Sequence, residues 1–329
     1  MKQLEAILLA VIALAAATAQ AITIETVAVG DAGNAADPST GSLYGAVSYN
    51  YNIGKYEVTI GQYTAFLNAV DAGGINPNEI YNSLMGTDAN IAGIRFDSGA
   101  ASGSKYAVMG ASGNHPVTYV SWFDAARFSN WLVNGQGSGG TETGAYTLNG
   151  ATSGIIEKNS GASWYIASED EWYKAAYYSP GASTDSYWLY PTQSDTAPGN
   201  VVGSGANQAN YYTGNYSVTQ SASYSGSQNY LTDGGAFSGS ASHYGTYDQG
   251  GNVWEWNDAV IGSSRGLRGG TWSDYYGVLQ SSYRNLISPA FENSLVGFRV
   301  ASVPEPSTAM LLGIVGAGWL VMKRRRVTL

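Results

Sequence analysis

The chain contains no cysteine among its 329 residues, and this absence removes several kinds of chemistry at once. Thiolate nucleophiles, iron–sulfur clusters, zinc–thiolate sites and disulfide bonds all require cysteine. Charged residues are also few, at 12%, and Asp and Glu outnumber Lys and Arg by 24 to 15. Because residues 22–302 contain no basic stripe, nucleic-acid binding is disfavoured. No repeat of about 20–50 residues is visible, which argues against a solenoid or a propeller.

The C-terminal tail contains three features that together predict where the protein goes. Pro304, Glu305 and Pro306 precede an apolar run at residues 309–322, and four cations follow at residues 323–326. As a helix this run would span roughly 21 Å, less than the ~30 Å hydrocarbon core of a bilayer, so flanking residues would snorkel or the bilayer would thin. The cations predict that the end of the tail stays on the cytoplasmic side and that the preceding chain lies outside.

This tail resembles the PEP-CTERM sorting signal of Gram-negative bacteria, in which a Pro-Glu-Pro motif, a transmembrane helix and a basic cluster occur in this order. The resemblance implies processing by an exosortase, a membrane protease that is thought to cut near the Pro-Glu-Pro motif. The helix at residues 309–322 would then anchor the protein in the membrane only until cleavage. The alternative is an ordinary tail anchor that is retained.

The N-terminus also predicts export. Lys2 precedes an apolar run at residues 6–17, and Ala19-Gln20-Ala21 is a small-x-small cleavage site. We therefore predict a secretory signal peptide at residues 1–21, with a retained membrane helix as the alternative, an exported domain at residues 22–302 and a sorting segment at residues 303–329. Five of the cations and two of the acids lie in the terminal segments, which changes the formal net charge from −9 for the chain to −12 for the domain.

The composition of the domain predicts a loop-rich α+β fold anchored by aromatic residues. The chain contains 43 Gly, 25 Tyr and 9 Trp, and we expect long ordered loops at residues 80–113 and 198–242. Three helices are predicted from N-cap residues followed by apolar positions at helical spacing, beginning after Thr59, Ser121 and Ser168. The segment at residues 46–58 alternates like a strand, and short strands with glycine-rich turns around residues 250 and 269 follow.

Seven motifs occur in an order that resembles one family, the formylglycine-generating enzymes or sulfatase-modifying factors. The likeness covers about residues 45–302, and the family's fold is a variant of the C-type lectin fold with little regular secondary structure. The motifs are residues 54–59 (GKYEVT), 115–122 (HPVTYVSW), 167–172 (ASEDEW), 251–256 (GNVWEW), 268–272 (RGGTW), 283–284 (YR) and 297–299 (GFR).

The resemblance extends to the scaffold and not to the family's oxidative chemistry. The enzymes of the family oxidise a cysteine in a sulfatase to formylglycine, using molecular oxygen and a copper ion that two cysteines hold. The matching positions here are Asp274 and Leu279, which cannot supply the thiolates that copper(I) requires. A related branch uses iron held by three histidines, but this chain has only His115 and His243. We therefore expect neither copper nor iron. A serine triad is not indicated either, because no predicted turn from a strand into a helix has a Gly-x-Ser-x-Gly signature.

Calcium is the cofactor that the resemblance implies. In the family, the segment matching residues 248–255 binds calcium, which corresponds to the side chains of Asp248 and Glu255 and the carbonyl groups of Gly251 and Val253. A glycine turn lets carbonyl oxygens converge on one ion. A second family site resembles Asn210 and Tyr211. The alternative is that Glu255 forms a buried ion pair with an arginine, such as Arg268 or Arg299, and that Asp248 caps a turn.

The place of the family's active-site groove is occupied by Trp272, Asp274, Tyr275 and Tyr276. Aromatic rings beside an acid suit recognition of sugars or peptides, because rigid rings provide contact area at low entropic cost. We therefore predict an exported, non-catalytic binding or structural protein of the cell surface or extracellular polysaccharide matrix, with a glycan or protein as its ligand. The alternative is an enzyme on the same scaffold with a reaction that needs no cysteine.

Overall fold

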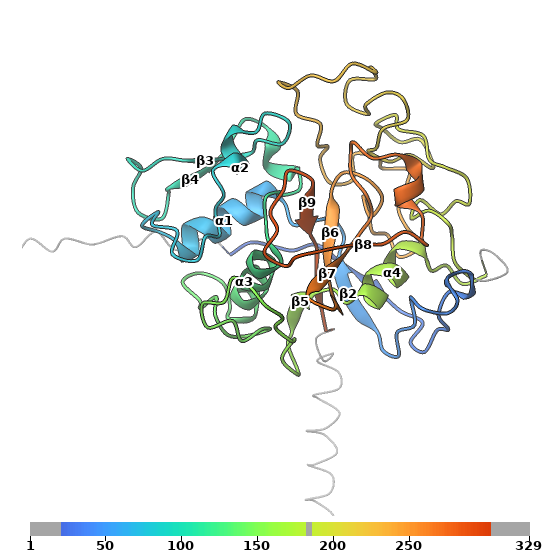
Figure 1. Cartoon of the computed structure of the whole chain (residues 1–329), viewed down its shortest axis with the longest axis horizontal. Coiled ribbons are helices and arrows are strands. Elements are labelled where there is room, and N and C mark those ends of the chain that lie inside the picture. The colour runs from blue at the N-terminus through green and yellow to red at the C-terminus, as the bar shows by residue number, and fades with distance from the viewer. Residues whose placement is uncertain (1–20, 182–185, 304–329) are drawn as a thin grey trace, which may run out of the picture.

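The computed structural model describes residues 21–181 and 186–303, which form two four-stranded sheets, a separate hairpin and several short helices. Figure 1 shows the sheets at the centre, with the helices and long loops around them. The α-helices are α1 (Ile60–Val70), α2 (Leu84–Thr87), α3 (Trp122–Val133) and α4 (Glu169–Tyr177). The 3-10 helices are η1 (Pro38–Thr40), η2 (Ser112–Asn114) and η3 (Tyr276–Leu279). The strands are β1 (Thr26–Val29), β2 (Tyr51–Gly54), β3 (Ile94–Phe96), β4 (Tyr106–Val108), β5 (Trp164–Ile166), β6 (Trp254–Ile261), β7 (Ser264–Arg268), β8 (Asn285–Ile287), β9 (Val296–Phe298) and β10 (Val300–Ser302).

The two large sheets are joined through a single residue. One sheet has the strand order β1-β2-β10-β5 and is antiparallel throughout. The other has the order β8-β7-β6-β9, in which β6 and β9 run parallel. Only Arg299 separates β9 from β10, so the chain passes from one sheet to the other at this side chain. The last strands therefore place Arg299 between the sheets.

The three helices predicted from N-cap residues are confirmed, and each begins with a capping box. Thr59, Ser121 and Ser168 each accept a hydrogen bond from the backbone N–H three residues later, and the side chain at that position accepts one in return. Two of the four backbone donors left free at each helix start are thereby satisfied. In α4 the first turn contains three acids, which the positive end of the helix dipole stabilises.

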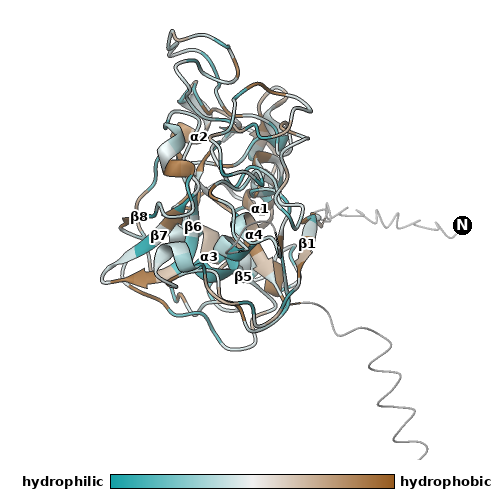
Figure 2. Cartoon of the chain, turned by 90° about the vertical axis from the view of Figure 1, so that its right-hand side faces the viewer, coloured by the Kyte–Doolittle hydropathy of each residue, from teal (hydrophilic) through white to brown (hydrophobic). Residues whose placement is uncertain are grey.

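Aromatic side chains from the helices form the centre of the core. Tyr63 and Phe66 of α1 pack against Phe128 of α3 with ring centroids 6.1 and 5.4 Å apart, and Phe298 of β9 meets Phe128 edge-on at 5.4 Å. These rings are fully buried. Figure 2 shows that the loops around this core mix hydrophilic and hydrophobic residues. Burial of large rings therefore compensates for the small amount of regular structure.

Two local predictions differ from the structure. The alternation at residues 46–58 predicts a long strand, but β2 has only four residues. The strand ends early because the chain leaves the sheet after Gly54, whose carbonyl accepts a hydrogen bond from Arg299. The region at residues 80–113, predicted as loop, contains the single turn of α2 and the β3–β4 hairpin. Conversely, residues 178–253 contain no helix or strand where they are described, only isolated bridges, as the loop prediction for 198–242 implies.

The predicted terminal segments fall almost entirely outside the described residues. The signal peptide at residues 1–21 overlaps the described chain only at Ala21, and the helix at residues 309–322 does not overlap it. Within residues 21–181 and 186–303, no helix has the length and apolar character needed to cross a bilayer.

Candidate functional site

Arg299, at the joint between the two sheets, is surrounded by acids. It is fully buried, and its Nε and Nη2 donate to the two carboxylate oxygens of Glu255 at 2.5 and 2.6 Å. Its Nη1 donates to the carbonyl of Gly54 at 2.9 Å, and Nη2 also donates to the carbonyl of Tyr247 at 2.9 Å. The Trp172 indole adds a third donor to Glu255, at 2.7 Å. This bidentate pair therefore ties β2, β6 and the β9–β10 joint together.

Two further acids lie beside this ion pair. The Glu57 carboxylate is buried, with one oxygen 4.0 Å from Arg299, and its pKa is well above the usual range because of burial and the charge of Asp248. Burial, with a smaller effect from Glu255, raises the pKa of Asp248 to about 6, although the backbone N–H of Gly235 donates to its carboxylate at 2.6 Å. Three carboxyl groups thus share one guanidinium.

These contacts decide how well the predicted calcium ligands fit an ion. Calcium takes six to eight oxygen ligands with free lone pairs. Both oxygens of Glu255 are already engaged by Arg299 and Trp172. Among the described residues, no three His, Cys, Asp or Glu side chains are grouped so that they could hold a metal. As arranged, the Glu255 carboxylate is already engaged, and calcium binding at Asp248, Gly251, Val253 and Glu255 stays a prediction.

The second predicted calcium pair lies in a network of amides and carbonyls. Asn210 is buried and its Nδ2 donates to the carbonyl of Tyr230 at 2.9 Å and to Oδ1 of Asn252 at 3.0 Å. The carbonyl of Tyr211 accepts from Nδ2 of Asn200 at 3.1 Å. These bonds hold the long loops before β6 together, which is a structural role that the sequence pattern did not indicate.

A layered group of aromatic rings lies where the loop at residues 211–230 meets the segment after β7. The indole of Trp272 stacks on Tyr230 with centroids 4.7 Å apart and planes at 9°, and Tyr224 also stacks on Tyr230, at 5.9 Å and 14°. Tyr216 contacts all three of these rings, at 4.6 to 6.2 Å. We call this surface, which consists of Tyr212, Tyr216, Tyr224, Tyr230, Trp272 and Tyr275, the Trp272 face.

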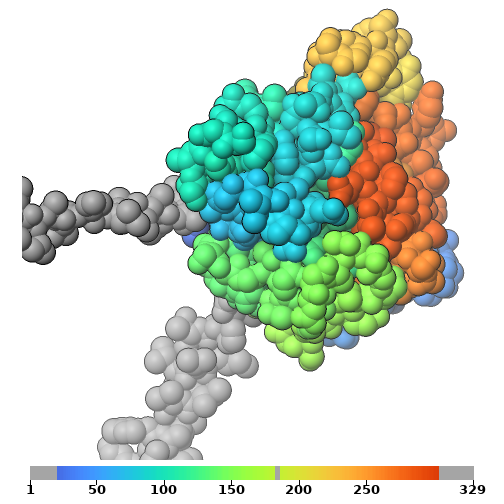
Figure 3. Space-filling view, turned by 60° about the vertical axis from the view of Figure 1, so that its left-hand side comes forward, coloured from blue at the N-terminus to red at the C-terminus, as the bar shows by residue number. Residues whose placement is uncertain are grey.

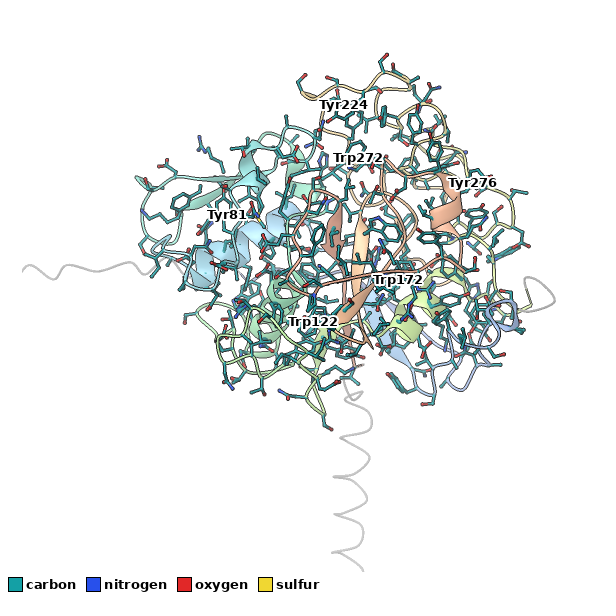
Figure 4. All side chains as sticks on the ribbon, in the orientation of Figure 1. Tyr81, Trp122, Trp172, Tyr224, Trp272 and Tyr276 are labelled. Atoms are coloured by element: carbon teal, nitrogen blue, oxygen red, sulfur yellow. The ribbon has the colours of Figure 1, made fainter. Side chains whose placement is uncertain are left out.

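The outer rings of the Trp272 face are open to solvent. Tyr224 is 58% exposed and Tyr275 is 64% exposed, whereas Tyr230 and Trp272 are buried beneath them. Tyr275 meets Tyr212 edge-on at 5.5 Å, and the backbone N–H of Tyr212 donates to the carbonyl of Asp274 at 2.9 Å. Figure 4 shows Tyr224 beside Trp272, with Tyr276 further to the side.

The four residues of the predicted groove therefore take different positions. Trp272 forms the floor of the face and Tyr275 lies on its outside, while the exposed Tyr276 begins η3. The Asp274 carboxylate turns back onto its own loop and accepts from the N–H and the hydroxyl of Thr271 at 3.1 and 3.0 Å. Burial raises its pKa. Leu279, at the other position that matches a family cysteine, is fully buried.

Four tyrosines of this face were not predicted as site residues. Tyr212, Tyr216, Tyr224 and Tyr230 come from the long loop, where the sequence indicated only that aromatic residues supply burial. The high density of tyrosine in that loop was the available signal. It could not show that the rings gather over Trp272, because the loop has no periodicity from which to infer which way a side chain faces.

Comparisons with known proteins agree with this architecture. The family model described as the sulfatase-modifying factor enzyme 1-like domain matches residues 28–303, and the model of the PEP-CTERM protein-sorting motif matches residues 302–326, which include Pro304, Glu305 and Pro306. No curated protein is significantly similar to this chain.

Three solved structures are similar to the chain. The crystal structure of CarF is 23% identical, with 86% of this chain and 99% of that chain covered and a TM-score of 0.50. Variable protein 1 of Treponema denticola is 20% identical, with 85% and 95% covered and a TM-score of 0.43. PvdO from Pseudomonas aeruginosa is 18% identical, with 78% and 82% covered and a TM-score of 0.43.

The fold and the order of the motifs confirm a loop-rich α+β domain of the C-type-lectin-like kind, and the sorting motif implies export with processing by an exosortase. The chain therefore belongs to the sulfatase-modifying factor enzyme 1-like family and carries a PEP-CTERM sorting motif at its C-terminus.

Proposed function

We propose that this protein is a non-catalytic binding protein of the cell surface or extracellular polysaccharide matrix, and that the Trp272 face binds a glycan. The observation that carries the proposal is the layered stack of Trp272, Tyr230 and Tyr224, which ends in an exposed ring. A flat, rigid tyrosine ring offers an apolar surface to the C–H face of a sugar.

The composition supports a binding role over the oxidative reaction of the family. Copper(I) needs soft sulfur ligands, and the chain has no cysteine at Asp274, at Leu279 or elsewhere. At the first of these positions the carboxylate of Asp274 is engaged by Thr271, so its contacts are those of a loop-stabilising residue.

The stack itself supports a preformed binding surface. Tyr224 Oη donates to Oδ1 of Asn90 at 2.5 Å, and the hydroxyl of Tyr230 accepts from the backbone N–H of Ser225 at 2.8 Å. Both hydroxyl groups hold their rings in place before any ligand arrives. A surface that is already ordered loses less conformational entropy on binding than a mobile loop does.

The proposal is tested by measuring binding of the purified full chain to the polysaccharide of the producing cells. We expect the double variant Tyr224→Ala/Tyr275→Ala to bind at least about tenfold more weakly, a change of roughly 1.4 kcal/mol. Tyr283→Ala is the matched control, since Tyr283 is 42% exposed and contacts Trp254 instead of the Trp272 face. This control should bind within about twofold of the wild type.

Two results would contradict the proposal. One is unchanged glycan binding by the double variant, with thermal unfolding showing that it is folded. The other is formation of an aldehyde on a sulfatase-derived peptide incubated with the protein, because that would show oxidation without thiolate ligands.

A further inference from the structure

The loop that supplies most rings of the Trp272 face is free of charge. Residues 196–232 contain no Asp, Glu, Lys, Arg or His, although charged residues make up 12% of the chain and Asp195 and Asp233 flank the segment. In their place the loop presents Ser, Thr, Asn, Gln and Tyr. Figure 3 shows the yellow and gold part of the chain, which includes this loop, at the top of the molecule beside the cyan and orange segments. The loop therefore contributes only neutral groups to the face.

Two acids approach the face from other segments, and the protein itself engages both. One oxygen of Asp88 accepts from the Tyr119 hydroxyl at 2.9 Å, and the other accepts at 3.1 Å from the backbone N–H of Asn90, whose side chain holds one exposed ring of the face. Asp274 accepts from the N–H and the hydroxyl of Thr271. In the described part of the chain, every cation that lies over an aromatic ring does so outside this face. An anionic ligand would therefore meet no counter-charge at these rings.

The two most exposed rings of the face are joined through two others. Tyr224 contacts Tyr216 with ring centroids 6.2 Å apart, Tyr216 contacts Tyr212 at 4.7 Å, and Tyr212 contacts Tyr275 at 5.5 Å. A ligand that covers both Tyr224 and Tyr275 also passes the partly buried rings between them. Because one pyranose is similar in size to one tyrosine ring, this series suits several linked sugar units better than a single sugar.

An uncharged sugar chain fits such a surface better than an acidic one. The C–H faces of neutral sugars pack on aromatic rings, and their hydroxyl groups exchange hydrogen bonds with water for hydrogen bonds with neutral side chains. An ionised carboxylate placed on these rings would lose part of its hydration without gaining a partner of opposite charge, which is costly. The negative face of each ring adds to this cost.

We propose that the Trp272 face binds an uncharged polysaccharide over several sugar units and discriminates against acidic polysaccharides. The proposal rests on the function proposed for this face, because it names the class of glycan that is bound there. The neutral loop at residues 196–232 provides the selectivity, and the series of rings from Tyr224 to Tyr275 provides the length. Since no ion pair holds the ligand, its binding does not depend on salt, whereas charge-based binding weakens as the screening length falls from about 10 Å at 0.1 M to about 3 Å at 1 M.

The polysaccharide of the producing cells, separated by anion exchange into a neutral and an acidic fraction, provides the test. Isothermal titration of the purified full chain should show at least about tenfold tighter binding to the neutral fraction. Reduction of the carboxyl groups in the acidic fraction to alcohols removes the charge and keeps the chain, so it should tighten binding at least about threefold. The affinity for the neutral fraction should change less than about twofold between 0.1 M and 1 M NaCl. Single sugars released from this fraction by hydrolysis should not compete.

A variant that adds charge tests the cause of the selectivity. Thr213 is exposed and lies next to Tyr212 in the chain, so Thr213→Lys should tighten binding of the acidic fraction at least about threefold at 0.1 M NaCl and lose this gain at 1 M. Binding of the neutral fraction should stay within about twofold of the wild type. Ser102→Lys is the matched control, because it adds the same charge at an exposed position in the β3–β4 hairpin and should change neither affinity.

The outcomes separate this inference from the proposed function. If the acidic fraction binds as tightly as the neutral one and Tyr224→Ala/Tyr275→Ala weakens both, the face binds glycans but the selectivity proposed here is wrong. A loss of neutral binding at high salt, or no effect of carboxyl reduction or of Thr213→Lys, also overturns the selectivity. If the wild type binds neither fraction, or if the folded double variant binds both fractions like the wild type, the proposed function fails as well.

Discussion

The Arg299→Ala substitution is expected to lower the free energy of unfolding by about 3–5 kcal/mol, which is typical when one partner of a buried ion pair is removed. Arg299 is fully buried and is held by both oxygens of Glu255. Without it, the Glu255 carboxylate stays between the sheets with only the Trp172 indole as a donor, and the neighbouring Glu57 and Asp248 lose the same counter-charge. The carbonyls of Gly54 and Tyr247 also lose a donor.

The magnitude follows from the largest of these effects. Each buried acceptor left unpaired costs about 1–3 kcal/mol by itself, but effects within one network do not add, so the ion-pair range is the better guide. For domains of about 150–250 residues, 1 kcal/mol moves the midpoint of thermal unfolding by roughly 2–4 °C. We therefore expect a fall in Tm of roughly 6–20 °C.

Urea unfolding and calorimetry of Arg299→Ala measure this change, with Lys55→Ala as the control. Lys55 also pairs with a glutamate, at 2.7 Å, but its side chain is 27% exposed and that of Glu25 is 58% exposed. Exposed pairs contribute about 0–1 kcal/mol, so the control should change little. The reasoning is refuted if Arg299→Ala is no less stable than Lys55→Ala.

Three further predictions concern metal, pH and helix capping. Chelation with EDTA should move Tm by less than about 1 °C, because Arg299 and Trp172 occupy the oxygens of Glu255. A fall in Tm of several degrees that added calcium reverses would instead support the calcium prediction. The pKa of Asp124 is higher in the folded protein than the value of about 3.9 that Asp has in the unfolded chain. Asp124 therefore contributes to the free energy of unfolding at pH values below about 3.9, and this contribution is lost as the pH rises through about 7. Urea unfolding of Asp124→Asn should therefore show a smaller loss of stability than the wild type between pH values of about 5.5 and 8, and equal losses would contradict this cause. Ser168→Ala removes the N-cap of α4 and should lower the free energy of unfolding by about 1 kcal/mol in the same assay. Ser102→Ala, at an exposed position, should change it very little. Equal effects of the two substitutions would argue against the capping role.

The starts of the helices were predictable because capping is local. Each capping box joins residues only three positions apart, so Thr59 with Gln62 and Ser121 with Asp124 identify helix starts from the sequence. The strand pairings were not predictable in this way. β10 lies between β2 and β5, with Ala301 opposite Ile53 and Tyr165, and no local pattern connects segments so far apart in the chain.

The partner of Glu255 shows the same limit. The sequence left calcium, Arg268 and Arg299 as alternatives for this carboxylate. In the structure, Arg268 donates to Glu169 at 2.8 Å, and Arg299 is left to pair with Glu255. All of these residues are charged and buried, so composition and spacing alone do not decide which acid meets which arginine.

Residue identity and short spacing were enough to predict the absence of thiolate chemistry, the sorting motif, the three helix starts and the order of the family motifs. The stacking of loop tyrosines over Trp272 and the approach of Asp124, Arg127 and Glu292 to one cavity at the start of α3 became visible only in the folded chain. The difference arises because hydrogen bonds within a helix turn act between near neighbours in the chain. Stacked rings and shared charges arise from packing between distant segments, which a one-dimensional pattern does not encode.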